Sequence, residues 1–282
     1  MLKNKYMHLV PTMLEEYSIN LNFELGFTNT TPLDYVTGLQ EVDMVRLFLA
    51  NGADANLQHG STLGGRPLLI AVLKGNQELV QMLVRRTDRI PCTRALGHAV
   101  SKQDTPIVNI LLANGVQCDF EEADRPPSLR IRSEYDFETN WTTFGDSSEP
   151  EEYTPPLVRA VYLGEADLVR LLLAHGANVN VGYHDLSSCL PGGFSYRVNS
   201  IFMECGMPIH LAMELGHEDL VRLLLENGAD IDLAQPVWPH HDCEMIPRDV
   251  HHQIMARLRS IAASVAQGSV SKSITSVITA VF

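Results

Sequence analysis

The sequence has little cysteine, few aromatic residues and no long apolar run. Its five cysteines are scattered along 282 residues, and this odd number favours free thiols in a reducing compartment over a disulfide framework. No apolar stretch is long enough to cross a bilayer, and no signal peptide with a basic start is visible. We therefore expect a cytoplasmic protein, with the nucleus as the alternative, and no membrane partner.

Basic residues are also scarce. The sequence has 21 Lys and Arg against 34 Asp and Glu, which gives a formal net charge of −13. Nucleic-acid phosphates require basic patches, so this balance argues against a nucleic-acid partner. A protein partner with a basic surface would be attracted instead, and the attraction would weaken as salt is added.

The motifs of the common enzyme classes are missing. There is no GxSxG, HExxH, P-loop or glycine-rich dinucleotide fingerprint. The alternative catalytic candidates are His184 beside Asp185, which could form a general base in a suitable pocket, and His210. Adjacent side chains point apart unless a turn brings them together, so we predict no catalytic residue and no cofactor.

A cluster of polar residues between positions 239 and 252 includes His240, His241 and Cys243, which are residue types that bind zinc. The adjacent histidines have no second cysteine at the interval of a closed zinc site. We therefore predict a solvated loop here and keep the three residues only as weak metal candidates.

What the chain does contain is repetition. Four leucine-rich runs end in a glycine-led pentapeptide, at Leu47–Asn56, Leu111–Asp119, Leu171–Asn180 and Leu223–Asp232. The marker glycines are 63, 61 and 52 residues apart, so the first interval holds two repeats of roughly 33 residues. The extra copy lies at Arg66–Arg86 and has lost its glycine end. Such units bury their apolar faces by stacking, and the stack exposes a long surface for recognition.

A shorter segment opens each repeat, as TPLDYV at Thr31, RPLLIA at Arg66, RALGHA at Arg94, PPLVRA at Pro155 and MPIHLA at Met207. The last copy continues as MPIHLAMELGHEDLVRLLLENGADID. The chain thereby resembles the ankyrin-repeat family, whose signature is TPLHxA followed by GHxEIVxxLLxxGADVN. The resemblance implies an all-α solenoid of helix-turn-helix pairs with finger loops, with about five repeats plus caps. It is similar to stand-alone, degenerate ankyrin proteins of filamentous fungi.

The repeats depart from the family motif at its polar positions. His210 alone keeps the motif's histidine and Thr31 alone keeps its threonine. The resemblance implies that these groups bond to one another and to the next repeat, so we expect weaker hydrogen bonding between repeats and greater reliance on apolar stacking. The glycine at each repeat end, such as Gly228, should stop its helix in a left-handed conformation.

The repeat pattern predicts eight segments. In order they are a degenerate N-terminal capping half-repeat (1–30), repeats one to three (31–120), an acidic and aromatic insertion (121–153), repeat four (154–182), a second insertion (183–206), repeat five (207–236), a helical C-terminal cap (237–267) and a Ser/Thr-rich tail (268–282). The cap is predicted because Val250, Ile254, Leu258, Ile261 and Val265 share one helical face. A solenoid needs such a polar-backed end.

The N-terminal half-repeat rests on two observations. Thr12 and Glu15 have the spacing of a capping box for a short helix that ends near Tyr17. Ile19–Asn20 aligns with Ala55–Asn56, which places the end of a finger there.

The two insertions supply the candidate binding residues. They are Tyr135, Trp141 and Phe144 in the first insertion and Tyr183, Phe194 and Tyr196 in the second. Aromatic side chains dominate binding hot spots, so these six are the predicted anchors. We expect both loops to close over the concave face between repeats three and five. The alternative is that each aromatic packs its own loop onto the stack.

The sequence thus predicts a non-catalytic scaffold or adaptor that binds a protein partner through its ankyrin surface and inserted loops. The alternative is a small-molecule-binding or catalytic accessory protein of a secondary-metabolite biosynthetic pathway, with a pocket formed by the two insertions. An enclosed pocket of several hundred Å³ would favour the small molecule, whereas an open groove would favour the protein.

Overall fold

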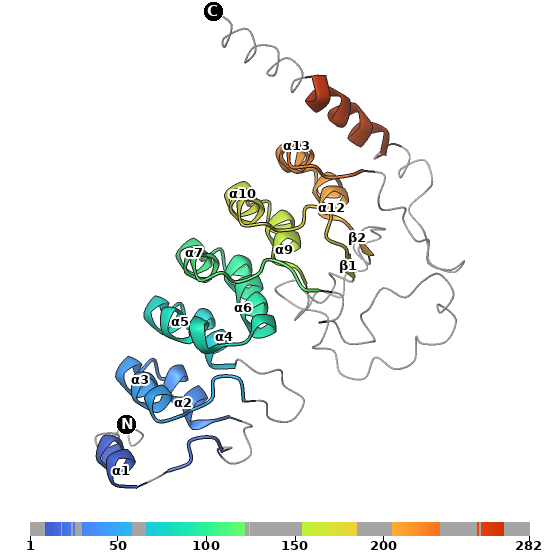
Figure 1. The fold of residues 1–282 in the computed structure, drawn as a ribbon. Helices are drawn as coiled ribbons and strands as arrows, with labels where there is room; N and C mark the ends of the chain where they lie inside the picture. Colours follow the sequence, from blue (N-terminus) through green and yellow to red (C-terminus); the bar gives the residue numbers. More distant parts are fainter. Residues whose placement is uncertain are drawn as a thin grey trace, which may run out of the picture. The chain divides into compact units, whose positions relative to one another are not determined.

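The computed structural model describes residues 9–17, 19–23, 25, 30–57, 66–121, 124, 154–184, 205–231, 253 and 255–267. Within these residues the chain forms pairs of short helices joined by tight turns (Figure 1). The chain divides into two compact units, Met1–Gln117 and Cys118–Phe282. The expected all-α ankyrin fold is confirmed, while the predicted segment boundaries stay predictions.

The first unit contains three helix pairs after a single short helix. Its elements are α1 (Val10–Glu16), α2 (Pro32–Gly38), α3 (Val42–Ala50), α4 (Arg66–Lys74), α5 (Gln77–Leu83), the 3₁₀ turn η2 (Val84–Arg86), α6 (Arg89–Ser101) and α7 (Thr105–Ala113). The first helices of the pairs, α2, α4 and α6, pack side by side, and so do the second helices α3, α5 and α7. The unit therefore has two layers of helices.

In its described residues, the second unit repeats this arrangement with two pairs, and one further helix follows at residues 255–267. Its elements are α9 (Pro156–Leu163), α10 (Ala166–Ala174), strands β1 (Tyr183–His184) and β2 (Cys205–Gly206), α12 (Pro208–Glu214) and α13 (Glu218–Glu226). Helix α9 packs on α12 and α10 packs on α13. The two short strands pair antiparallel, with Tyr183 opposite Gly206 and His184 opposite Cys205.

The core is the strip of apolar side chains between the two layers. The third residue of each repeat opening is buried, at Leu33, Leu68, Leu96, Leu157 and Ile209. Removing one such side chain from water contributes roughly 1.5–3 kcal/mol. Because every repeat supplies the same position, burial continues from one helix pair to the next within each unit.

Helix starts follow from the repeat openings. Proline occupies the first turn of α2, where its missing N–H costs nothing. The Thr31 hydroxyl accepts a hydrogen bond from the Asp34 backbone N–H at 3.0 Å, and Asp34 Oδ2 accepts one from the Thr31 N–H at 2.8 Å. Asp34 stands where the family motif has histidine, so in this repeat the position closes a capping box.

In four repeats the second helix is followed by a glycine in the left-handed backbone conformation, as expected. The marker glycines Gly52, Gly115, Gly176 and Gly228 have φ between 79° and 88°. The turn inside each helix pair also needs one left-handed residue, and glycine takes it at Gly75, Gly164 and Gly216. Glutamine takes it at Gln40 (φ 62°) and Gln103 (φ 55°), where a side chain makes the conformation unfavourable.

Helix α1 differs from the expected capping box. It begins at Val10, and Pro11 lies in its first turn. The N-cap residue Leu9 makes no side-chain hydrogen bond to the helix. Thr12 is therefore inside the helix, and the predicted cap is wrong. Proline fixes the backbone angle of a first turn, which explains the earlier start. The predicted end near Tyr17 is confirmed, since Tyr17 follows the last helical residue.

Asparagine side chains in the finger loops connect successive repeats. Asn56 Nδ2 donates to the Arg86 carbonyl at 3.0 Å, and its Oδ1 accepts from the Asp88 N–H at 2.8 Å. Asn22 makes the same pair of bonds, to the Gly52 carbonyl and the Asp54 N–H. Each asparagine amide thus supplies two hydrogen bonds, one to a backbone carbonyl and one to a backbone N–H that would otherwise lack partners in the turn.

The position of Asn22 corrects the predicted alignment. The Asn22 N–H donates to Asn20 Oδ1 at 2.9 Å, just as the Asn56 N–H donates to Asp54 Oδ1 at 2.8 Å. Asn22 is therefore the equivalent of Asn56, and the alignment of Ile19–Asn20 with Ala55–Asn56 is wrong by two residues. Asn20 and Asn22 each follow an apolar residue, so the sequence pattern does not distinguish them.

Asn180 makes the same bridge in the second unit. Its Nδ2 donates to the Gly228 carbonyl at 3.3 Å, and its Oδ1 accepts from the Asp230 N–H at 2.9 Å. In the same unit, the Asp119 carboxylate accepts a hydrogen bond from the Asn178 N–H at 2.7 Å. Hydrogen bonding between repeats therefore does not depend only on the motif's histidine and threonine, because the finger asparagines also bond the next repeat.

A helix over residues 255–267 covers the end of the second unit. The side chains of its own residues Leu258 and Ile261 are buried. Arg222 Nη1 donates to Ser264 Oγ at 3.3 Å, and Arg257 forms an ion pair with Glu218 of α13. Val250 and Ile254 of the expected apolar face lie outside the described residues.

Candidate protein-binding surface

Most of the predicted site residues lie outside the described part of the chain. These are the aromatic anchors Tyr135, Trp141, Phe144, Phe194 and Tyr196, the catalytic candidate Asp185, and the metal candidates His240, His241 and Cys243. Tyr183 and His184 are placed by their backbone alone, in β1. The insertion pocket and the metal alternative therefore stay predictions.

His210 lies at the first turn of α12 with its side chain fully buried. Its Nε2 is 3.3 Å from the carbonyl oxygen of Ile231, in the segment that follows α13. The imidazole therefore ties the start of a first helix to the finger at the end of the same repeat. This contact gives His210 a structural role.

The described residues contain neither a metal-site cluster nor a membrane-spanning helix. No group of three or more His, Cys, Asp and Glu side chains in these ranges could hold a metal ion. None of the helices described there is both long enough and apolar enough to span a membrane.

An apolar ridge lies along the first helices of the first unit. It consists of Tyr35, Leu39, Ile70 and Leu73, which we call the first-helix ridge. Tyr35 and Leu39 are each 37% exposed and Leu73 is 47% exposed. Ile70 is half-buried and occupies in α4 the position that Tyr35 has in α2. Since α2 packs on α4, the ridge extends across two repeats.

Helix periodicity explains why these side chains reach the surface. Leu33 and Val36 in α2, and Leu68 and Val72 in α4, face the core and are buried. Tyr35 falls between the two buried positions of α2, on another face of the helix. The ridge is therefore apolar surface that stays partly exposed outside the core strip.

The ridge becomes polar at the third repeat. Lys102 follows α6, and its Nζ donates a hydrogen bond to the backbone carbonyl of Leu73. His98 of α6 holds the position equivalent to Tyr35 and is half-buried. An apolar surface with a charged end at α6 is thus presented by α2, α4 and α6.

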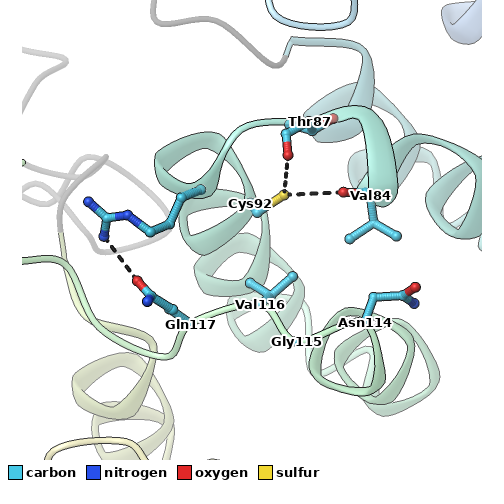
Figure 2. Close-up of a pocket in the computed structure, with 8 residues that line it drawn as sticks. Val84, Thr87, Cys92, Asn114, Gly115, Val116 and Gln117 are labelled. Atoms are coloured by element: carbon cyan, nitrogen blue, oxygen red, sulfur yellow. Dashed lines mark hydrogen bonds between the residues drawn. The ribbon is translucent and has the colours of Figure 1, made fainter.

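A small cavity lies elsewhere in the first unit, between η2, the start of α6 and the turn after α7 (Figure 2). Its volume is about 220 Å³. The lining residues are Val84, Thr87, Arg89, Cys92, Asn114, Gly115, Val116 and Gln117. The Cys92 thiol donates to the carbonyl oxygens of Thr87 at 3.4 Å and Val84 at 3.7 Å. It is thus held toward the protein backbone.

The Cys92 thiol is unsuited to nucleophilic chemistry. Burial, followed by the nearby charge of Asp88, raises its pKa to about 12. The nucleophile in cysteine chemistry is the thiolate, which is therefore scarce here at neutral pH. Cys92 contributes packing and hydrogen bonding to the cavity.

Two arginines near the cavity donate hydrogen bonds to side-chain amides. Arg89 Nη1 donates to Gln117 Oε1 at 3.0 Å (Figure 2), and Arg85 Nε donates to Asn114 Oδ1 at 3.0 Å. In the sequence, Arg85 and Arg86 stand where the second repeat lacks its glycine end. They belong to the run VRRTDR at residues 84–89, which is unusually basic for so acidic a chain.

The charge of the chain is unevenly distributed along the sequence. Residues 1–117 contain ten basic and ten acidic residues, whereas residues 118–282 contain 11 basic and 24 acidic residues. The whole formal charge of −13 therefore belongs to the second unit. The formal charge of the first unit is zero.

Comparison with known proteins identifies relatives at the sequence level. The chain is 22% identical over 235 residues to human transient receptor potential cation channel subfamily A member 1, covering 80% of this chain and 17% of that protein. It is 37% identical over 70 residues to the non-secreted LysM effector LysM17 of Penicillium expansum, covering 23% of this chain and 9% of that protein. The chain thus spans less than a fifth of the length of either relative.

Solved structures and family models give the fold and the family. The crystal structure of the ankyrin repeat domain of Bcl-3, a member of the IkappaB family, matches with a TM-score of 0.52 and 22% identity, covering 79% of this chain and 80% of that chain. A model of three ankyrin-repeat copies matches residues 39–124 and 93–235. Ankyrin repeats generally mediate protein–protein interaction. Since those matches extend over most of the sequence and its described helices form the expected pairs, the chain belongs to the ankyrin-repeat family.

Proposed function

We propose that this chain is a non-catalytic adaptor that holds a protein partner on the first-helix ridge. The observation that carries the proposal is the exposure of Tyr35, Leu39 and Leu73 on adjoining repeats. Large apolar side chains gathered on a surface mark interaction sites, and a tyrosine supplies contact area at low entropic cost. The partner on this ridge would contribute apolar side chains of its own.

The charge distribution supports a second feature of the partner. Residues 118–282 have 13 more acidic than basic residues. A partner with a basic surface would be steered toward this unit, and its association rate would fall as salt is added. We propose that the partner combines an apolar anchor for the ridge with basic side chains. The aromatic residues of the two insertions remain proposed contacts of the same partner.

We also propose a cytoplasmic location. Cys92 and Cys118 are free thiols in the structure and both are buried, as suits a reducing compartment. Imaging of the tagged chain in its native cell tests this, and accumulation in the secretory pathway would contradict it.

The binding proposal is tested by affinity capture with three versions of the full chain. The versions are the natural sequence, the double variant Tyr35→Ala/Leu73→Ala and the control Met13→Ala, which removes an equally exposed apolar side chain (48%) from α1. A genuine ridge partner is captured by the natural chain and by the control but lost with the double variant. If the double variant captures the same proteins in the same amounts, the ridge is not the docking surface.

A further inference from the structure

We propose that the first-helix ridge binds a peptide segment in which one large apolar side chain is followed or preceded closely by an acidic residue. The apolar side chain rests over Gly38, and the carboxylate pairs with Lys74 and Lys102. This inference rests on the ridge being the docking surface proposed above, and it deepens that proposal by naming the chemistry of the bound segment. The basic side chains proposed for the partner address the acidic second unit and lie elsewhere on the partner.

Gly38 is a glycine that the fold does not require. It is the last residue of α2, and the left-handed residue of this turn is Gln40, two positions later. Apart from the chain next to it, nothing lies within 4 Å of a Cβ added to Gly38. Glycine in a helix lowers stability, because it loses more conformational freedom on folding than any other residue. Since Gly38 serves neither a turn nor a close contact, the space that it leaves open at the surface explains its presence.

This space, which we call the Gly38 opening, lies among the apolar side chains of the ridge. Tyr35 precedes Gly38 by three residues and therefore lies on the same face of α2. Gly38 holds in α2 the position that Leu73 holds in α4, and these two helices pack side by side. Leu73 is 47% exposed. A leucine, methionine or phenylalanine of the partner would thus contact Tyr35 and Leu73 across a position that has no side chain.

Two lysines border the ridge at the same position of successive repeats. Lys74 follows Leu73 at the end of α4, and Lys102 follows α6; both side chains are exposed. Lys102 Nζ donates to the Leu73 carbonyl, which places one ammonium group beside a ridge residue. None of the ion pairs within the described residues includes either lysine. An ammonium group has three N–H donors, so both lysines can still bind a carboxylate.

Acidic groups are scarce on the first helices. Asp34 is the one acidic residue in α2, α4 and α6, and it is 3% exposed inside the capping box of α2. Other carboxylates of this unit belong to the second helices: Glu41 and Asp104 precede α3 and α7, and Glu78 of α5 pairs with Arg46. Asp104 Oδ1 caps α7. The exposed charge on the first helices is therefore positive and complementary to an acidic residue.

The order of these features along the stack sets the spacing within the ligand. The Gly38 opening belongs to α2, Lys74 to α4 and Lys102 to the end of α6, and α4 packs on both α2 and α6 (Figure 1). Packed helices lie about 8–10 Å apart, which is the length of about three extended residues. We therefore expect the acidic residue within about three positions of the apolar anchor.

A peptide selection tests this chemistry. Random dodecapeptides displayed on phage are first depleted on the full-length double variant Tyr35→Ala/Leu73→Ala, which removes peptides that bind elsewhere, and are then selected on the natural full chain. We expect the enriched peptides to carry Leu, Met, Phe or Trp within about three residues of Asp or Glu. Enrichment of basic or uncharged peptides, or of none, would overturn the proposal.

Matched variants then test the two contacts with the most enriched peptide, whose affinity is measured by fluorescence anisotropy. Gly38→Leu fills the opening and should weaken binding at least tenfold, whereas Asn109→Leu, which adds the same side chain to the exposed face of α7, should not. Lys74→Gln/Lys102→Gln should weaken binding about fivefold at low salt and less as salt is added, because exposed ion pairs are screened. Arg46→Gln removes an exposed cation from α3 and should leave binding unchanged.

The outcomes separate this inference from the proposed function. Circular dichroism verifies the fold of each variant, and Gly38→Ala, which should bind severalfold more weakly, replaces Gly38→Leu if that variant does not fold. An unchanged peptide affinity in the glycine variant or in the lysine variant would overturn this inference, even where Tyr35→Ala/Leu73→Ala still loses the captured partner. Capture that persists in that double variant would instead contradict the ridge as the docking surface.

Discussion

The imidazole of His217 lies directly against the backbone of Gly164, so that a Cβ added to Gly164 would be 3.0 Å from His217 Cε1. Gly164 turns the chain between α9 and α10, and His217 precedes α13. Glycine is required here twice, because φ is 75° and because the neighbouring turn occupies the space of a side chain. The contact explains how consecutive turns stack in the second unit.

Gly164→Ala should lower the free energy of unfolding by about 2–5 kcal/mol, which combines left-handed strain of about 1–2 kcal/mol with overpacking of about 1–3 kcal/mol. Gly216 is the matched control, since it has the same φ of 75° and open space around it. Gly216→Ala should cost only the strain. Urea unfolding of both variants measures the difference, and equal losses would show that the His217 contact is unimportant.

The left-handed glutamine at Gln103 predicts a stabilising substitution. Gln103→Gly removes the strain of φ 55° and should raise the free energy of unfolding by about 0.5–1 kcal/mol after the added entropy of the unfolded chain is counted. At Gln40 the gain should be smaller, because Gln40 Oε1 accepts a hydrogen bond from Asn76 Nδ2 at 3.4 Å. Chemical unfolding tests both changes, and a loss of stability at Gln103 would contradict the strain argument.

Asn56→Ala should destabilise the first unit by about 1–3 kcal/mol, because it leaves the Arg86 carbonyl and the Asp88 N–H without their bonds to the finger. The control is Asn109→Ala on the exposed face of α7, which should change stability by less than about 0.5 kcal/mol. Unfolding of each variant followed by circular dichroism provides the values. Similar values for the two variants would mean that the finger bond contributes nothing.

The two buried thiols predict a loss of stability at alkaline pH. Burial raises the pKa of Cys92 from 9.0 to about 12 and that of Cys118 from 9.0 to about 11. A group whose folded pKa is raised stabilises the fold fully below the unfolded pKa and loses this contribution as pH rises to the folded value. Stability should therefore fall between about pH 9 and 12 through Cys92. The fall should be shallower in Cys92→Ala, and identical slopes would contradict the shift.

The repeat framework was predictable because it depends on local chemistry. Glycine at positions such as Gly52 and Gly228 is needed for a left-handed helix end, and proline in the first turn of α2 suits a free helix start, so each letter points to one geometry. At the N-terminus the letters were ambiguous. Asn20 and Asn22 both fit a finger, and only the bonds to Gly52 and Asp54 select Asn22.

The surface was less predictable than the core. The predicted anchors lie in the insertions, where aromatic density is conspicuous, whereas Tyr35 and Leu73 lie in helices where an apolar residue normally indicates core. Their exposure depends on which helix face the next repeat covers, and this is a property of the stack. The small cavity between η2, α6 and the turn after α7 likewise joins residues near 85 to residues near 115 through packing.

The most direct test of the adaptor proposal is the affinity of a captured partner for purified variants, measured by isothermal titration calorimetry. Tyr35→Ala/Leu73→Ala should weaken binding at least tenfold, since hot-spot truncations cost about 2 kcal/mol or more. Met13→Ala should bind with the affinity of the natural chain. An unchanged affinity in the double variant, with its fold intact, would contradict the account.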